Sequence, residues 1–141
     1  MCPGGPAAVV ARAASKGVSG CITISTTTQD CLKALEIACS HPRIWCTSGI
    51  HPLHAHEGPH EWANLLTVAR HEKCVAWGEM GLDNHYDRPP RSVQDPVLEE
   101  HLAFIETQVK AGLRKPIVIH CREAFDDLIP ILKRTSLDSR R

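Results

Sequence analysis

The stretch CVAWGE at residues 74–79 carries an apolar strand directly into a carboxylate, and PIVIH at residues 116–120 carries a second strand into an imidazole. A helix-patterned segment lies between them, so the two strands are predicted to form a βαβ unit and to run parallel. The C-terminal ends of parallel strands share one edge of the sheet, where α/β folds gather ligands and catalytic groups. Glu79 and His120 are therefore expected at the same edge, and both are ligand types that zinc and other divalent metals accept.

Helical and strand patterns alternate along the whole chain. The clearest helix carries Leu98, Leu102 and Ile105 on one face, and Asp95 is predicted to cap it with Pro96 at its first position. The strand patterns are short apolar runs bounded by turn residues. The expected strands cover residues 18–25, 44–50, 74–78 and 117–119, and the expected helices cover 7–16, 31–40, 60–70, 96–111 and 123–133.

This alternation indicates an α/β fold, in which helices cover a parallel sheet. We expect a single domain over residues 1–141, with its core at about 7–133 and a frayed polar tail at 134–141. Pro130 predicts a kink or an early stop in the last helix. A closed eight-stranded barrel takes about 250 residues. The four strands therefore predict half of a larger fold or a small open sheet with unpaired edges.

The composition bounds the partners and the location of the protein. The chain is 43% hydrophobic, and its 16 basic and 16 acidic residues give a formal net charge of zero. Bulk charge therefore indicates neither nucleic acid nor a membrane as partner, although a bound metal can supply positive charge locally. Seven scattered cysteines without a Cys-x-x-Cys pair indicate reduced thiols. With no signal-peptide pattern and no membrane-spanning run, we expect a cytoplasmic or nuclear location.

Three predicted strands end in polar side chains, in the motifs GIHP (49–52), GEMGLD (78–83) and IHCRE (119–123). Glu79 can bridge two metals through its two oxygens, or it is a solvated loop residue. His120 is a metal ligand, or a half-buried histidine satisfied by a backbone carbonyl. Arg122 has a planar fork suited to phosphate oxygens, or it pairs with Glu123 or Asp126. Three such ends at one sheet edge favour a functional site over chance.

A histidine-dense loop follows the second predicted strand and holds His51, His54, His56 and His60. A His-x-His pair at 54–56 suggests zinc, but no cysteine lies nearby in sequence and prolines bracket the segment. We therefore favour an exposed loop over a structural zinc site. His51 is the exception, because it stands at the strand end itself.

The motifs at 49–52, 78–83 and 115–124 resemble those of the TatD family of metal-dependent deoxyribonucleases, in order and in spacing. The resemblance covers roughly residues 7–133. It implies a TIM-type (β/α)8 barrel of the metal-dependent hydrolase kind, of which this chain supplies about half. It also implies a divalent metal centre of magnesium, manganese or zinc at the C-terminal face, and hydrolysis of phosphodiester bonds in DNA, commonly from the 3′ end.

Carried over position by position, the resemblance makes Glu79 a metal-bridging glutamate and His120 a metal-binding histidine. It places His51 and Arg122 near the pocket, where phosphate binding is a plausible role. The family's Asp-x-His-x-His motif on the first strand, and its later histidine and aspartate, have no counterpart in this sequence. We therefore expect a truncated form that holds part of a metal centre.

Three functions follow from these observations. The first is a TatD-type deoxyribonuclease with DNA as substrate and no membrane partner. The second is a non-catalytic partial barrel that binds another protein through its open edges. The third is another metallohydrolase of the same barrel superfamily, acting on a carbon–nitrogen or ester bond. The stretch GEMGLD at 78–83 favours the nuclease.

Overall fold

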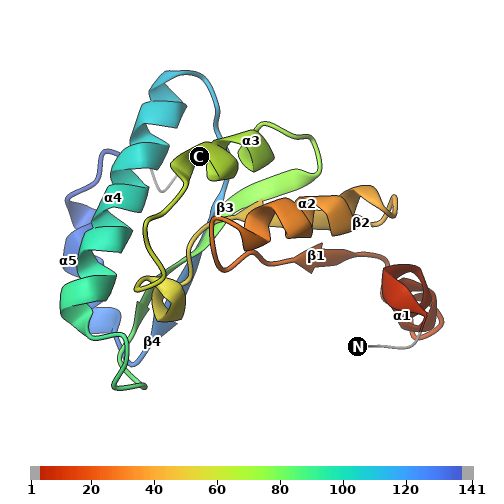
Figure 1. The fold of residues 1–141 in the computed structure, drawn as a ribbon, viewed down its shortest axis with the longest axis horizontal. Helices are drawn as coiled ribbons and strands as arrows, with labels where there is room; N and C mark the ends of the chain where they lie inside the picture. Colours follow the sequence, from red (N-terminus) through yellow and green to blue (C-terminus); the bar gives the residue numbers. More distant parts are fainter. Residues whose placement is uncertain (1–3, 138–141) are drawn as a thin grey trace.

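The computed structural model describes residues 4–137 and confirms the predicted alternation of helices and strands (Figure 1). The elements follow in the order α1 (Gly5–Ala14), β1 (Cys21–Thr23), α2 (Asp30–Cys39), β2 (Ile44–Ser48), the 3-10 helix η1 (Pro52–His54), α3 (Trp62–Ala69), β3 (Cys74–Asp83), α4 (Arg91–Lys110), β4 (Ile117–Arg122) and α5 (Phe125–Lys133). None of the helices described between residues 4 and 137 is long and apolar enough to cross a bilayer.

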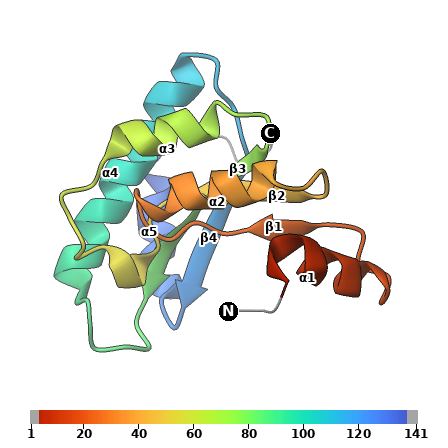
Figure 2. The ribbon, with the colours of Figure 1, turned by 45° about the vertical axis from the view of Figure 1, so that its right-hand side comes forward.

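The four strands form one parallel sheet in the order β1-β2-β3-β4. Each strand returns to the sheet through a helix: α2 packs on β1 and β2, α3 on β2 and β3, α4 on β3, and α5 on β4. Figure 2 shows α2, α3 and α4 gathered over the sheet, while α1 lies beside β1, away from α4 and α5. The arrangement is about half of a TIM-type barrel, as predicted.

The core lies between the sheet and these helices. Trp77, Leu65, Met80, Leu82 and Ile105 are fully buried there, and burying such a side chain contributes about 1.5–3 kcal/mol. The predicted stripe on α4 is confirmed, because its leucines and Ile105 all face this core.

The third and fourth strands run further than the sequence predicts. β3 continues through Asp83 and β4 through Arg122, so Glu79 and His120 lie within strands rather than directly after them. Gly81 explains the continuation, because a Cβ there would lie 1.8 Å from the carbonyl oxygen of His120. Without a side chain at this position, the two backbones approach closely and stay paired beyond the apolar run.

The start of α4 also differs from the prediction. The helix begins at Arg91, so Asp95 does not cap it and Pro96 lies inside it. Asp95 instead pairs with Arg91 one turn earlier, with Arg91 Nε 2.7 Å from Asp95 Oδ1. Pro130 likewise lies inside α5, which continues to Lys133, so the predicted early stop is wrong. Because α4 begins at Arg91, the loop between β3 and α4 covers only residues 84–90.

The predicted tail falls partly outside the described residues. Residues 138–141 are not described, and neither are residues 1–3. Within the described part, Arg134 pairs with Glu99 at 2.5 Å and Leu137 packs against the core.

Candidate metal centre

Three side chains from three segments converge at the C-terminal edge of the sheet. His51 follows β2, Glu79 lies on β3 and His120 lies on β4, and their ligand atoms all fall within 4.8 Å of one another. His120 Nδ1 lies 3.0 Å from Glu79 Oε1 and 3.1 Å from His51 Nε2. The predicted pair, Glu79 and His120, is therefore in contact, and His51 contacts the same histidine.

Strand pairing places two of the three. Gly81 pairs with His120 across β3 and β4, which brings Glu79, two residues before Gly81, next to the histidine ring. The side chains remain accessible, since Glu79 is 27% and His120 18% exposed. A ligand or ion can thus reach both from the open side of the edge.

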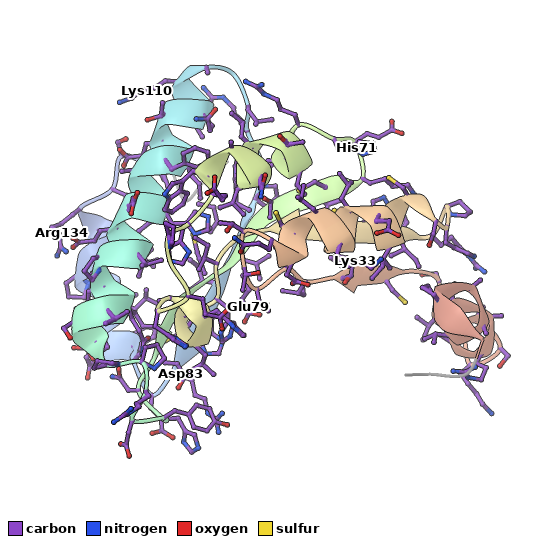
Figure 3. The ribbon with its side chains drawn as sticks, in the orientation of Figure 1. Lys33, His71, Glu79, Asp83, Lys110 and Arg134 are labelled. Carbon is purple, nitrogen blue, oxygen red and sulfur yellow. The ribbon has the colours of Figure 1, made fainter. Side chains whose placement is uncertain are left out.

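Asp83, at the end of β3, fixes the orientation of His120. Its side chain is 1% exposed, and Asp83 Oδ2 lies 2.8 Å from His120 Nε2. Burial acts to raise the pKa of Asp83, but hydrogen bonds from His120 and from the backbone N–H of His85 outweigh it and hold that pKa below its usual value. Both ring nitrogens of His120 face a carboxylate, Asp83 at Nε2 and Glu79 at Nδ1. The shorter contact with the buried Asp83 favours the proton of a neutral ring on Nε2, which leaves the lone pair on Nδ1. Figure 3 shows Asp83 beside the loop that leads into α4, with Glu79 further back along the same strand.

The chemistry of these donors fits a cation. A carboxylate oxygen of Glu79 faces the lone pair of His120 Nδ1 at 3.0 Å, and two such groups attract each other only through a proton or a metal ion. A carboxylate that holds the far nitrogen of a histidine is also the usual support of a metal-ligating imidazole. Glu79 and His120 can therefore hold a divalent ion, with Asp83 behind the histidine.

His51 is held differently from His120. Its Nδ1 accepts a hydrogen bond from the backbone N–H of Leu53 at 3.2 Å, in the turn that starts η1. Burial, and then the neighbouring His120, lower the pKa of His51. A neutral ring whose Nδ1 accepts carries its proton on Nε2. In this arrangement His51 presents a donor to the site, which suits an oxygen of a phosphate or a water better than a metal ion.

Arg122 is the last residue of β4 and lies at the same C-terminal edge of the sheet. Its guanidinium lies 5.1 Å from the ring centre of Tyr86, and Nη1 donates to the tyrosine hydroxyl at 3.3 Å. The alternative of an ion pair between Arg122 and Glu123 or Asp126 is not observed among the described residues, and Glu123 lies 3.0 Å from His85 instead. The charge of Arg122 is thus not neutralised by a carboxylate among the ion pairs of the described residues.

The sequence model of the family described as "TatD related DNase" matches residues 3–140, nearly the whole chain. The chain belongs to this family. The predicted resemblance is confirmed, and so is the assignment of the fold as part of the family's barrel.

Known TatD proteins show how much of the family this chain spans. It is 40% identical over 124 residues to the human 3′-5′ RNA nuclease TATDN2, covering 84% of this chain and 15% of that protein. It is 37% identical over 127 residues to the 3′-5′ ssDNA/RNA exonuclease TatD of Erwinia tasmaniensis, covering 89% and 47%. The crystal structure of the TatD homologue YjjV from Escherichia coli K12 superposes with a TM-score of 0.77 at 28% identity, covering 95% of this chain and 52% of that one. The chain therefore spans at most about half the length of these relatives.

The remaining histidines of the loop after β2 do not belong to the cluster of His51, Glu79 and His120. His54 Nδ1 contacts Glu57 at 2.6 Å, His60 Nε2 contacts the Ala55 carbonyl at 3.1 Å, and His56 is exposed. None of them belongs to a cluster of metal-ligand atoms within residues 4–137. The predicted exposed loop is therefore confirmed only in part, since His56 is exposed but His54 and His60 are half-buried.

Two residues of the site have no role in the sequence interpretation. Asp83 belongs to the motif GEMGLD, but its partner His120 lies 37 positions away and only strand pairing joins them. Tyr86 lies in a polar loop without periodicity, and no pattern in the sequence connects it with Arg122. The only signal in the sequence is a pair of carboxylates four positions apart near a strand end, Glu79 and Asp83, with Gly81 midway between them.

Proposed function

We propose that this chain carries part of the active site of a divalent-metal-dependent phosphodiesterase acting on single-stranded nucleic acid. The observation that carries the proposal is the pairing of Glu79 with His120 at 3.0 Å, supported from behind by Asp83. Glu79 and His120 are the proposed metal ligands. Membership in the TatD family and the names of the relatives, which act on single-stranded DNA or RNA, support this substrate class.

When bound, magnesium, manganese or zinc supplies Lewis acidity toward a phosphate oxygen and lowers the pKa of a bound water. Asp83 keeps the proton of His120 on Nε2, so that Nδ1 carries a lone pair that can bind the ion. His51 is proposed to donate its Nε2–H to a phosphate oxygen, and Arg122 to offset the negative charge of the phosphate. Both groups lie at the same sheet edge as Glu79 and His120.

The proposed nuclease acts on DNA, the substrate that the resemblance implies, and the relatives' names support RNA beside it. Cytoplasm or nucleus is the proposed location, supported by the six cysteines of the described part, all of which are free thiols.

The test separates metal binding from hydrolysis. Metal binding to the purified chain is measured by titration calorimetry, and hydrolysis by loss of a labelled single-stranded oligonucleotide with each of the three metals. Glu79→Gln is expected to abolish both, and Glu36→Gln, at an exposed glutamate on α2, to change neither. Hydrolysis that survives in Glu79→Gln, or metal heats equal to those of the wild type, would contradict the assignment.

His51→Gln distinguishes the two roles that the site offers His51. As a phosphate donor, its loss raises KM or lowers kcat by about tenfold or more while metal affinity is kept. An equal loss of metal affinity in His51→Gln and Glu79→Gln would make His51 a ligand instead.

A second candidate function, protein binding through the open sheet, is favoured by one observation. Ile22 on β1 is 54% exposed, and the outer edge of β1 has no partner strand among residues 4–137. An unpaired edge of this kind invites pairing with another chain. This function requires no metal, so loss of Glu79 leaves it intact.

A further inference from the structure

The loop between β3 and α4, residues 84–90, is tied to the metal centre by short contacts. The backbone N–H of Asn84 donates to the carbonyl of Arg122 at 2.9 Å. The backbone N–H of His85 donates to Asp83 Oδ1 at 2.9 Å, and its ring lies 3.0 Å from Glu123. The loop is therefore positioned by Asp83, which also orients His120, and by Arg122 and Glu123 at the end of β4.

Tyr86 is the most prominent side chain of this loop. It is 49% exposed, and its contact with the Arg122 guanidinium fixes the ring while leaving about half of the residue open. The ring of His85 meets it edge-on, with 4.8 Å between ring centres. An exposed aromatic ring held by an arginine is the kind of platform on which nucleobases stack, whatever their identity.

A hollow of about 510 Å³ opens beside Tyr86, within the usual range for sites of small ligands. Four carboxylates line it together with Tyr86, those of Asp83, Asp87, Asp95 and Asp127. The guanidinium of Arg91 lines it too and pairs with Asp95 and Asp127, which leaves four carboxylates against one cation. Carboxylates repel a phosphate, but they accept hydrogen bonds from the exocyclic amino groups of bases. The hollow therefore keeps an excess of negative charge, which favours the phosphate on the Arg122 side and an uncharged, amino-bearing group in the hollow.

We propose that Tyr86 and the hollow beside it form a nucleobase subsite, which holds a base of the strand whose phosphate faces Glu79 and His120. The subsite rests on the proposed function, since it assumes a nucleic-acid substrate at the metal centre. It assigns substrate positioning to the β3–α4 loop. Any base has a face to stack on Tyr86, and the carboxylates of the hollow favour bases that carry an exocyclic amino group over those that lack one.

The single tyrosine of the chain makes a direct test possible. Protein produced with 3-fluorotyrosine has one fluorine resonance, which reports on Tyr86 alone. A short oligodeoxyadenylate is titrated in EDTA, so that no hydrolysis occurs, and compared with a sugar–phosphate strand of equal length that lacks bases. The expected result is a larger shift of the resonance with the oligodeoxyadenylate than with the baseless strand, whose phosphates reach Tyr86 only through Arg122; equal shifts, or none, overturn the subsite.

Two variants test the same contact through the Kd values of the oligodeoxyadenylate and the baseless strand. Tyr86→Ala is expected to raise the Kd of the oligodeoxyadenylate about five- to a hundredfold, while Tyr86→Phe, which keeps the ring, stays within about twofold. Neither substitution should change the Kd of the baseless strand. A wild-type Kd in Tyr86→Ala counts against stacking, and so does a loss shared by both strands.

Failure of the subsite and failure of the proposed function give different results. Metal-dependent hydrolysis by the wild type, without the fluorine shift, overturns the subsite and leaves the nuclease function standing. The shift without hydrolysis in any metal supports base binding by Tyr86 and counts against catalysis by this chain.

Discussion

Counted across the strands, the sheet has a β3–β4 end and a β1 end, and the two differ in the side chains that they carry. At one end, β3 and β4 remain paired as far as Asp83 and Arg122, and this extended pairing brings Glu79 to His120. At the other end, β1 is only three residues long, and it exposes Ile22 rather than presenting polar donors. The difference teaches that strand pairing at the β3–β4 end builds the site. A backbone change there should therefore cost far more than the same change near β1.

A pair of glycine substitutions gives the largest expected contrast. Gly81→Ala places a Cβ 1.8 Å from the His120 carbonyl oxygen at a φ of +151°, so we expect a loss of about 4 kcal/mol or more in the free energy of unfolding. Gly17→Ala, between α1 and β1 at a φ of +86°, meets no atom within 4 Å and should cost about 1–2 kcal/mol. Urea denaturation followed by tryptophan fluorescence measures both. Similar losses would show that the two ends are equally tolerant.

His101 on α4 predicts the next largest effect, a dependence of stability on pH. Its ring is completely buried, packs on Trp62, and has no hydrogen-bond partner for either nitrogen among the described residues. Burial, and then the nearby His60, lower the pKa of His101 to about 3. In the unfolded chain its pKa is about 6.5.

These two pKa values determine whether stability rises or falls with pH. Between about pH 6.5 and 3 the unfolded state binds a proton that the folded state refuses, so stability is full above this window and falls as the pH drops through it. The loss is about 1.4 kcal/mol per pH unit, or about 3 kcal/mol at pH 4.5. His101→Leu should remove this part of the slope between pH 7.5 and 4.5 in urea titrations. An unchanged slope would mean that His101 takes up a proton in the folded protein.

Asp83 tests the support behind the metal ligand. Asp83→Asn keeps the shape but replaces a carboxylate by an amide, which weakens its hold on the Nε2 proton of His120. We expect metal affinity to fall about 10- to 100-fold, measured by calorimetry, and the fold to be retained by circular dichroism. Asp126→Asn, at an exposed position in the first turn of α5, is the control and should bind metal like the wild type. Equal affinities in the two variants would remove Asp83 from the site.

The contrast between Glu79 and Asp83 also shows what the sequence can predict. The parallel order of strands follows from alternating patterns, because strands buried on both faces read as continuous apolar runs. Glu79 and His120 stand directly after such runs, so their position at one edge was predictable. Asp83 was not, because its role depends on a side-chain contact across two strands, and the ends of β3 and β4 were missed because polar residues there resemble a loop. Tyr86 depends on the fold of a loop that no periodicity marks.

The smallest expected effect on stability belongs to the β1 end. Ile22→Lys changes a side chain that is already 54% exposed, so the free energy of unfolding should stay within about 0.5 kcal/mol. Its effect should appear in association instead, because a lysine on an open edge strand opposes pairing with another chain. Light scattering over a range of protein concentrations should show less association in Ile22→Lys than in the wild type. Phe125→Lys removes an even more exposed apolar side chain, 67% exposed at the start of α5, a helix that packs on β4 and not on β1. If both variants reduce association equally, general surface hydrophobicity drives it; if only Ile22→Lys does, the open β1 edge is the binding surface, at the end of the sheet opposite the metal centre.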